Sequence, residues 1–176
     1  MKKLLGTFLV GALALAALAI AQPARAENND AKLTEKVITA IQDYPPFGMF
    51  DDVTFTVDDR VVTLYGHVTR PIKKDELGKR VGKLDGVREI VNDIQVLPMS
   101  PMDDQVRNRV ARAIYNHPSF WQYASMSQPP IHIIVEGGHV TLTGSVGNDM
   151  DRKLAYALAQ VPGSLSVKND LKVDGK

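Results

Sequence analysis

Apolar and polar residues alternate along several short stretches of the chain, and the clearest of these stretches occurs twice. Residues 62–68 read VTLYGHV and residues 140–146 read VTLTGSV, so a second copy lies 78 residues downstream of the first. Alternation at every second position is the pattern of a half-buried β-strand. Gly66 and Gly144 fall on the apolar side, where we expect either a helix that crosses closely or a bulged strand.

The repetition extends in both directions from this strand. Residues 53–57 (VTFTV) correspond to residues 131–135 (IHIIV), and residues 84–94 correspond to residues 161–171. Further upstream, residues 40–47 correspond to residues 113–120. A repeat of this length indicates two diverged copies of one small module.

Each copy is predicted to contain a helix, two strands, a second helix and a final strand. Thr34 is expected to cap the first helix of the first copy, and Asp103 or Asp104 that of the second. Pro71 starts the second helix of the first copy, and Asn148 or the next residue caps its counterpart. Charged and polar residues at these positions follow the usual rules for helix starts.

The predicted fold class is therefore α+β, with two tandem α-β-β-α-β domains. In each domain both helices should cover one face of a three-stranded sheet, and the Thr-rich opposite face should be exposed. We assign the domains to residues 33–97 and 103–175. Residues 98–102 form a short linker that two prolines stiffen, so the copies should be close neighbours.

Two pairs of residues recur at positions where a structural role is expected. Gly86 and Gly163 follow the second helices, where a left-handed helix end is common. Asn92 and Asn169 lie on the apolar face of the final strands. A buried amide without a hydrogen bond costs about 1–3 kcal/mol, so each asparagine is expected to hold a nearby loop or strand end.

The N-terminus lies outside both copies. Lys2 and Lys3 precede an apolar run, and residues 24–26 read Ala-Arg-Ala, which is a typical cleavage site. We therefore predict a signal peptide over residues 1–26, cleavage after Ala26 and an exported protein; a retained membrane anchor is the alternative. The chain has no cysteine, so neither a disulfide nor a lipid on cysteine is available.

Removal of the signal peptide changes the charge balance of the chain. Lysine and arginine fall from 21 to 18, against 20 acidic residues, which leaves a mature chain that is slightly acidic. A nucleic-acid-binding protein usually carries a clear basic excess, so nucleic acid is not an expected partner.

The strand motif V-T-L-x-G-x-V, the glycine after the second helix, and the endings IVNDI (residues 90–94) and VKNDL (167–171) resemble the BON family. The resemblance covers nearly all of the mature chain, twice over. It implies a non-catalytic module that binds phospholipid or attaches to membranes. Behind a signal peptide, it also implies a periplasmic protein of the osmotically induced kind. Some two-copy relatives are outer-membrane lipoproteins, and this chain lacks the cysteine that they need.

No constellation of residues points to catalysis, a metal or a cofactor. The four histidines, at positions 67, 117, 132 and 139, do not have the spacing of metal ligands. The sequence contains neither a Gly-rich phosphate loop nor a Ser-His-Asp order. We therefore expect no catalytic residue, no bound metal and no cofactor.

The second copy differs from the first in one region that suits a membrane surface. Its first helix carries Arg107, Arg109 and Arg112, and a lengthened loop after it holds Trp121 and Tyr123. Arginine beside aromatic residues is favoured at a bilayer interface, so these five residues are the predicted lipid-binding site on anionic phospholipid. The alternative for the two aromatic residues is that they complete the core.

A simple estimate indicates reversible binding rather than anchoring. Three basic residues near an anionic surface contribute roughly 3 kcal/mol, and one partly buried aromatic about 2 kcal/mol. The alternative function is a periplasmic holdase, or an interaction module for unfolded or envelope proteins, that uses the aromatic loop and the exposed strand edges.

Overall fold

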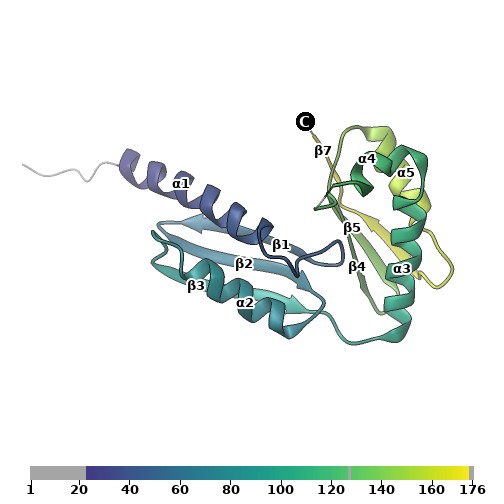
Figure 1. Cartoon of the computed structure of the whole chain (residues 1–176), viewed down its shortest axis with the longest axis horizontal. Coiled ribbons are helices and arrows are strands. Elements are labelled where there is room, and N and C mark those ends of the chain that lie inside the picture. The colour runs from purple at the N-terminus through teal and green to yellow at the C-terminus, as the bar shows by residue number, and fades with distance from the viewer. Residues whose placement is uncertain (1–22, 127, 175–176) are drawn as a thin grey trace, which may run out of the picture.

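The structure, a computed structural model, describes residues 23–126 and 128–174 (Figure 1). Residues 1–22, and with them most of the predicted signal peptide, lie outside the described part. The predicted cleavage site after Ala26 falls in the first turns of α1, which spans Pro23–Gln42. Thr34 does not cap this helix as predicted, because it lies well inside it and its hydroxyl donates to the carbonyl of Asp30. No helix within the described residues is long and apolar enough to cross a bilayer.

The first copy has the predicted order of elements. After α1 come β1 (Asp52–Asp58), β2 (Val61–Val68), α2 (Pro71–Gly82) and β3 (Glu89–Val96). β1 is antiparallel to β2, β3 is parallel to β2, and the sheet order is β1-β2-β3. Both helices lie on one face of this sheet (Figure 1). Their apolar sides form the core there, with Val37, Leu64, Leu77, Val81 and Ile94 fully buried.

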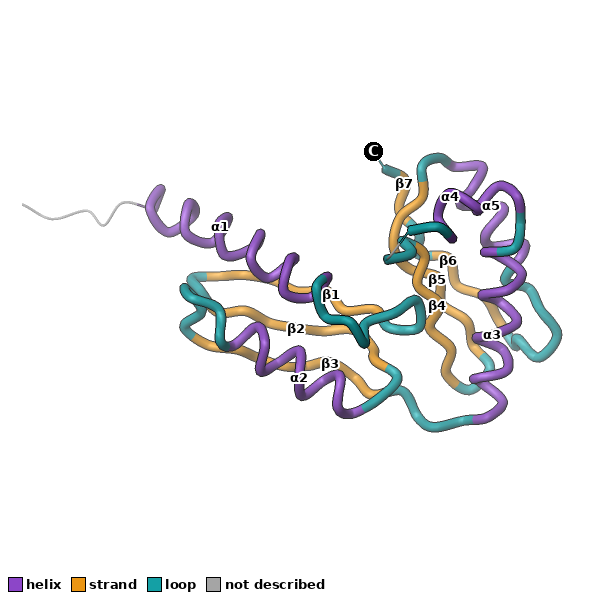
Figure 2. The backbone as a smooth tube through the Cα atoms, viewed as in Figure 1, coloured by secondary structure: helices purple, strands orange, loops and turns teal. Residues whose placement is uncertain are grey.

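The second copy repeats the plan with two additions. It contains α3 (Pro101–Tyr115), β4 (Ile131–Glu136), β5 (His139–Val146), α5 (Asp149–Leu158), β6 (Ser166–Asn169) and β7 (Lys172–Val173). The predicted final strand is thus divided into β6 and β7, which both pair with β5. The loop before β4 contains a short helix, α4 (Trp121–Ala124; Figure 2), preceded by a 3-10 turn, η1 (Pro118–Phe120). The sequence predicted neither of them.

The start of α3 differs from the prediction. Pro101 and Met102 belong to the helix rather than to the linker, and Ser100 caps it by accepting a hydrogen bond from the amide of Asp103. The prediction that Asp103 or Asp104 caps the helix is therefore wrong. Asn148 caps α5 as predicted, by accepting from the amide of Asp151.

The repeated strand glycines are required by the backbone and not by a crossing helix. Gly66 and Gly144 have φ angles of +116° and +99°, which L-residues with side chains rarely adopt. A Cβ on Gly144 would also lie 1.9 Å from the carbonyl oxygen of Pro130, and one on Gly66 2.1 Å from that of Asp52. The helix-crossing alternative is therefore wrong. Pairing of β1 with β2 continues through Gly66 without an extra residue.

The other repeated residues act at the ends and starts of helices. Gly86 and Gly163 follow α2 and α5 with positive φ, as predicted. The side-chain amide of Asn92 donates to the carbonyl of Lys74 in α2, and that of Asn169 to the carbonyl of Arg152 in α5. Each asparagine thus joins the final strand to the second helix, and Asn169 also holds the end of β6 as expected, by accepting from the amide of Leu171 at 3.3 Å.

The two copies are in direct contact through the loop that precedes β1. The carbonyl of Met49 accepts a hydrogen bond of 2.7 Å from the amide of Ile133 in β4. Met49 and Phe50 also pack against the hydrophobic core of the second copy, and the rings of Phe47 and His132 are 5.6 Å apart. The outer edge of β4 is therefore occupied, and the first copy completes part of the core of the second.

Candidate membrane-contact surface

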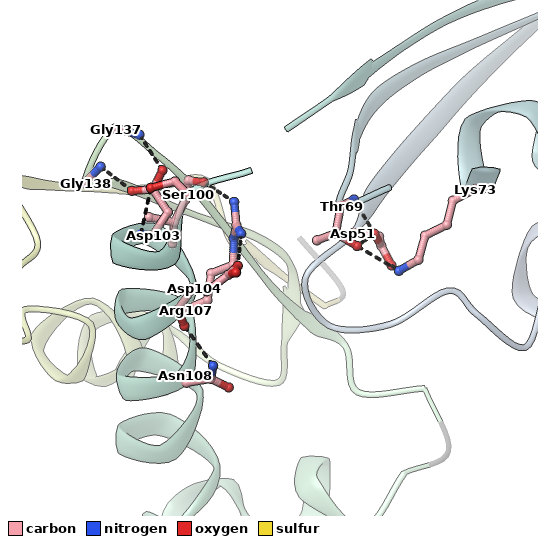
Figure 3. Close-up of polar contacts among 11 residues, drawn as sticks. Asp51, Thr69, Lys73, Ser100, Asp103, Asp104, Arg107, Asn108, Gly137 and Gly138 are labelled. Carbon is pink, nitrogen blue, oxygen red and sulfur yellow. Dashed lines mark hydrogen bonds and ion pairs between the residues drawn. The ribbon is translucent and has the colours of Figure 1, made fainter. Parts of the chain in front are cut away.

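The α3 helix is held against its own sheet by an acidic residue in its first turn. Asp103 is buried, and its carboxylate accepts from the amides of Gly137 and Gly138 in the β4–β5 turn at 3.0 and 2.7 Å (Figure 3). Burial alone would raise the pKa of Asp103, but these amides, with Ser100 and Arg107, outweigh it and lower the pKa. In the first copy, Asp30 accepts from the corresponding turn amides of Asp59 and Arg60.

Arg107 does not reach the surface. Its side chain is 4% exposed. One guanidinium nitrogen donates 2.6 Å to the carbonyl of Val135, and the other contacts the carboxylate of Asp104 (Figure 3). This arginine fastens α3 to β4, so it is not available to a phospholipid.

Arg109 and Arg112 are exposed on α3, three residues apart. Arg109 donates to the carbonyl of Pro162 at 2.7 Å, and Arg112 to the carbonyl of Asn108 at 3.1 Å. Both use backbone carbonyls, and neither forms an ion pair within the described residues. Their positive charges are therefore available on the helical face of the second copy.

The three aromatic residues of the lengthened loop have different environments. Phe120 is fully buried and Tyr123 is 6% exposed, whereas Trp121 between them is 63% exposed. The hydroxyl of Tyr123 accepts from the amide of Gly147 at 2.8 Å and lies 3.3 Å from the carboxylate of Asp151. Phe120 and Tyr123 thus fix α4 to the body of the domain and hold Trp121 outward.

Two methionines that the sequence analysis did not select are also exposed at this end of the domain. Met126 follows α4, and Met150 lies in the first turn of α5 and is 73% exposed. The hydroxyl of Tyr123 joins α4 to α5, because it lies 3.3 Å from the carboxylate of Asp151. The repeat alone places an apolar residue at both positions, because Ile72 lies 78 residues before Met150, but only the structure shows that both side chains are exposed.

The structure thus divides the five predicted lipid-binding residues into two groups. Arg109, Arg112 and Trp121 are exposed in α3 and α4, as are Met126 after α4 and Met150 in α5. Arg107 and Tyr123 are buried and hold α3 and α4 in place. We name the exposed group, with Met126 and Met150, the membrane-contact surface.

The first copy has a different group where Tyr123 lies in the second. Asp51 is fully buried, and its carboxylate contacts the ammonium of Lys73 at 2.6 Å (Figure 3). It also accepts from the amide and the hydroxyl of Thr69 at 2.9 and 3.0 Å. Every partner is satisfied within the domain, so this buried ion pair has a structural role.

Histidines gather between the copies without forming a metal site. A cleft of about 620 Å³ is lined by His67 from the first copy and His139 from the second. His132 lines an adjoining cavity of about 490 Å³. No group of three or more potential ligands that could hold a metal ion occurs in the described part of the chain.

Comparisons with known proteins identify the repeated module. The model of the BON domain matches residues 29–98 and again residues 103–175. The sequence matches none of the curated proteins with which it was compared.

Similar solved structures include two of CdsD, a structural protein of the type III secretion system of Chlamydia trachomatis, one of them its C-terminal domain. Both are 18% identical to this chain and cover 80% of it, and the match spans 91% and 96% of their own length. The TM-scores are 0.29 and 0.31, which are too low to support any inference.

Proposed function

Because this chain belongs to the BON domain family, with two domains in tandem, we propose that it is a non-catalytic periplasmic protein that associates reversibly with anionic phospholipid surfaces. BON domains bind phospholipid and occur in periplasmic and envelope proteins, and the family is non-catalytic. We place the role of the protein in envelope integrity or the response to osmotic stress.

The exposure of Trp121 is the observation that carries this proposal. A large aromatic side chain that is 63% exposed, between two buried aromatic anchors, is costly to leave in water. Tryptophan is favoured at the headgroup level of a bilayer, where its ring is apolar and its N–H remains hydrated. Met126 and Met150 supply further apolar contact at the same end of the domain.

The charges of Arg109 and Arg112 supply the preference for anionic lipid. Two arginines near such a surface contribute roughly 2 kcal/mol, and partial burial of one aromatic residue about 2 kcal/mol. The sum of about 4 kcal/mol corresponds to a dissociation constant near the millimolar range. Binding of this strength is reversible, and it is weaker than the sequence estimate because Arg107 is buried.

Vesicle flotation tests the proposal. We expect the mature chain to float with vesicles that contain phosphatidylglycerol but not with phosphatidylcholine alone, and high salt should weaken the binding. Replacing Arg109 and Arg112 together by glutamate should abolish binding without unfolding the domain, because both side chains are exposed. The matched control reverses Lys79 and Arg80 in the first copy and should bind almost normally. Equal loss in both variants would contradict the assignment.

The fluorescence of Trp121 gives a direct readout, because the chain has no other tryptophan. Emission should begin at the long wavelength of an exposed indole and shift to the blue when anionic vesicles are added. Emission that does not move while the protein floats with vesicles would place the contact on another face.

The alternative, a holdase or protein-interaction module, is favoured by a different observation. Met99 is 99% exposed, and Met102 and Ile72 are also exposed near the linker. An apolar surface of this kind suits unfolded or envelope proteins as partners. Suppression of the aggregation of an unrelated protein, unaffected by salt and by the Arg109 and Arg112 substitutions, would favour this function over lipid association.

A further inference from the structure

A groove in the first copy takes no part in the membrane-contact surface. It lies between α2 and the edge strand β3, has a volume of about 450 Å³, and is lined by Asp75, Gly78, Lys79, Gly82, Lys83 and Ile90. Its floor is the side chain of Ile90 and the bare backbone at the two glycines. The groove therefore combines an apolar floor with a charged rim.

The backbone of α2 does not require the two glycines, although a side chain on Gly78 would press against Asn92. Neither has a positive φ, and each costs a helix about 1 kcal/mol relative to alanine. In the second copy the corresponding residues are Tyr156 and Gln160. Asn169 still donates to its helix there at 2.8 Å, as Asn92 does at 2.9 Å in the first copy. The open groove is thus a feature of the first copy alone.

The strand beside the groove has an unpaired edge. β3 has eight residues and is the last strand of its sheet (Figure 1). The amide of Leu97 donates to Val68 in β2. Because amides alternate in direction along a strand, those of Ile90, Asn92, Ile94 and Val96 face away from β2, and that of Ile94 makes a long hydrogen bond of 3.4 Å to the side chain of Asn92. By contrast, β4 pairs with Met49 at its outer edge, and the strand corresponding to β3 is divided into β6 and β7.

The charges along the groove complement each other under two-fold symmetry. Asp75 lies at one end, and Lys79 and Lys83 lie toward the other. On the α1 side of the helix, Tyr44 contacts both Glu76 and Arg80, so those charges are already engaged. If two grooves meet in antiparallel orientation, the acidic end of each faces the basic end of the other.

We propose that two copies of this chain associate by antiparallel pairing of their β3 strands about a two-fold axis at Asn92. Ile90 then lies opposite the partner's Ile94 and Asp93 opposite the partner's Val91, so no like charges are directly opposed. The two three-stranded sheets become one continuous sheet. The backbone amides and carbonyls at the open edge of β3 then receive hydrogen-bond partners from the second copy.

The helices fit this arrangement. α2 packs over β2 and β3, so the two α2 helices are separated by two strand spacings, about 10 Å. This is the distance at which helices pack, and close packing requires small residues between them. A Cβ on Gly78 would lie 2.4 Å from the side-chain amide of Asn92 in the same chain, so this glycine brings α2 close to the strand residue at the proposed axis.

Analytical ultracentrifugation of the mature chain, without lipid, tests the proposal over a wide range of concentrations. We expect a monomer–dimer equilibrium. Gly82→Gln introduces the residue of the second copy and should raise the dissociation constant at least about tenfold, or about 1.4 kcal/mol. It should change the melting temperature little, because glutamine favours a helix more than glycine does, which offsets a Cβ placed 3.3 Å from the side chain of Ile90. The matched control is Ala157→Gln on the exposed side of α5, which should dimerise normally.

A charge exchange identifies the partner as a second copy in this orientation. Asp75→Lys and Lys83→Asp should each weaken self-association, and an equimolar mixture of the two variants should form a mixed dimer. If the parent chain is monomeric at every concentration, the proposal is overturned. The groove and the edge of β3 would then be a binding site for a strand of another protein. A dimer unaffected by Gly82→Gln, or variants that do not associate when mixed, overturns the proposal as well. Lipid association is not involved in any of these outcomes.

Discussion

The two copies fasten the start of their second helix with opposite chemistry. In the first copy the carboxylate of Asp51 accepts from the amide of Thr69 and pairs with Lys73. At the corresponding positions of the second copy, 78 residues later, the amide belongs to Gly147 and the side chain to Asp151. There the phenol of Tyr123 accepts from the amide and contacts the carboxylate. The anionic Asp151 thus takes the place of the cationic Lys73, and the hydroxyl of Tyr123 takes the place of the carboxylate of Asp51.

This difference shows which part of the arrangement the fold requires. The backbone amide before the helix receives a side-chain acceptor in both copies, from Asp51 in the first and from Tyr123 in the second. The residue that supplies this acceptor differs between the copies, and the residue at position 73 or 151 beside it differs as well. In the second copy the acceptor comes from α4, and the same short helix presents Trp121 to solvent. The change of fastening is therefore linked to the formation of the membrane-contact surface.

The largest expected effect comes from breaking the ion pair of the first copy. Asp51→Ala leaves the buried ammonium of Lys73 without its carboxylate, with only the hydroxyl of Thr69 as a partner, which should reduce the free energy of unfolding by about 3–5 kcal/mol. Tyr123→Phe in the second copy removes only a neutral hydrogen-bonding group and should cost about 1 kcal/mol. Urea unfolding followed by circular dichroism measures both.

The control for this comparison replaces both partners of the ion pair. Asp51→Ala combined with Lys73→Met should recover part of the lost stability, because no charge is then left buried. Equal costs for Asp51→Ala and Tyr123→Phe would show that the two fastenings are energetically equivalent, against our interpretation.

An intermediate effect is expected at the strand glycines, where the copies are alike. Gly144→Val combines a backbone angle unsuited to valine with a clash against Pro130, and should cost at least about 1–3 kcal/mol. Gly66→Val meets the same obstacle at Asp52 and should cost a similar amount. Thermal melting of both variants makes the comparison. An unchanged melting temperature in either variant would mean that its strand relaxes away from the observed geometry.

The smallest effect concerns acid stability and the Asp103 contact with the turn of the second copy. The pKa of Asp103 is lowered in the folded chain, so its ionised form contributes stability at a pH above its unfolded value, about 4. That contribution is lost as the pH falls through the lowered pKa of the folded state. Asp103→Asn should therefore be less stable than the parent near neutrality, and the difference should shrink in acid. Melting temperatures across this range measure it, and a constant difference would contradict the assignment.

The sequence alone determined the parts of this protein that depend on local pattern. Alternating strands, helical spacing and the twofold repeat predicted the α-β-β-α-β order and the shared face for the helices, and Gly86 and Gly163 were recognisable at helix ends. These features could be predicted because short-range periodicity and backbone conformation are written in neighbouring residues. The division between exposed Arg109 and Trp121 and buried Arg107 and Tyr123 could not be predicted in the same way.

Only the tertiary structure decided that division, because burial depends on elements that are distant in sequence. Arg107 is buried where it donates a hydrogen bond to Val135 in β4. Tyr123 is buried where its hydroxyl accepts from the amide of Gly147, which precedes α5. In the same way, Met49 and Phe50 look like loop residues of the first copy, yet they pack against the core of the second. Local pattern places a residue on a helix or in a loop, but the partner that removes it from solvent is chosen by the packing of the whole chain.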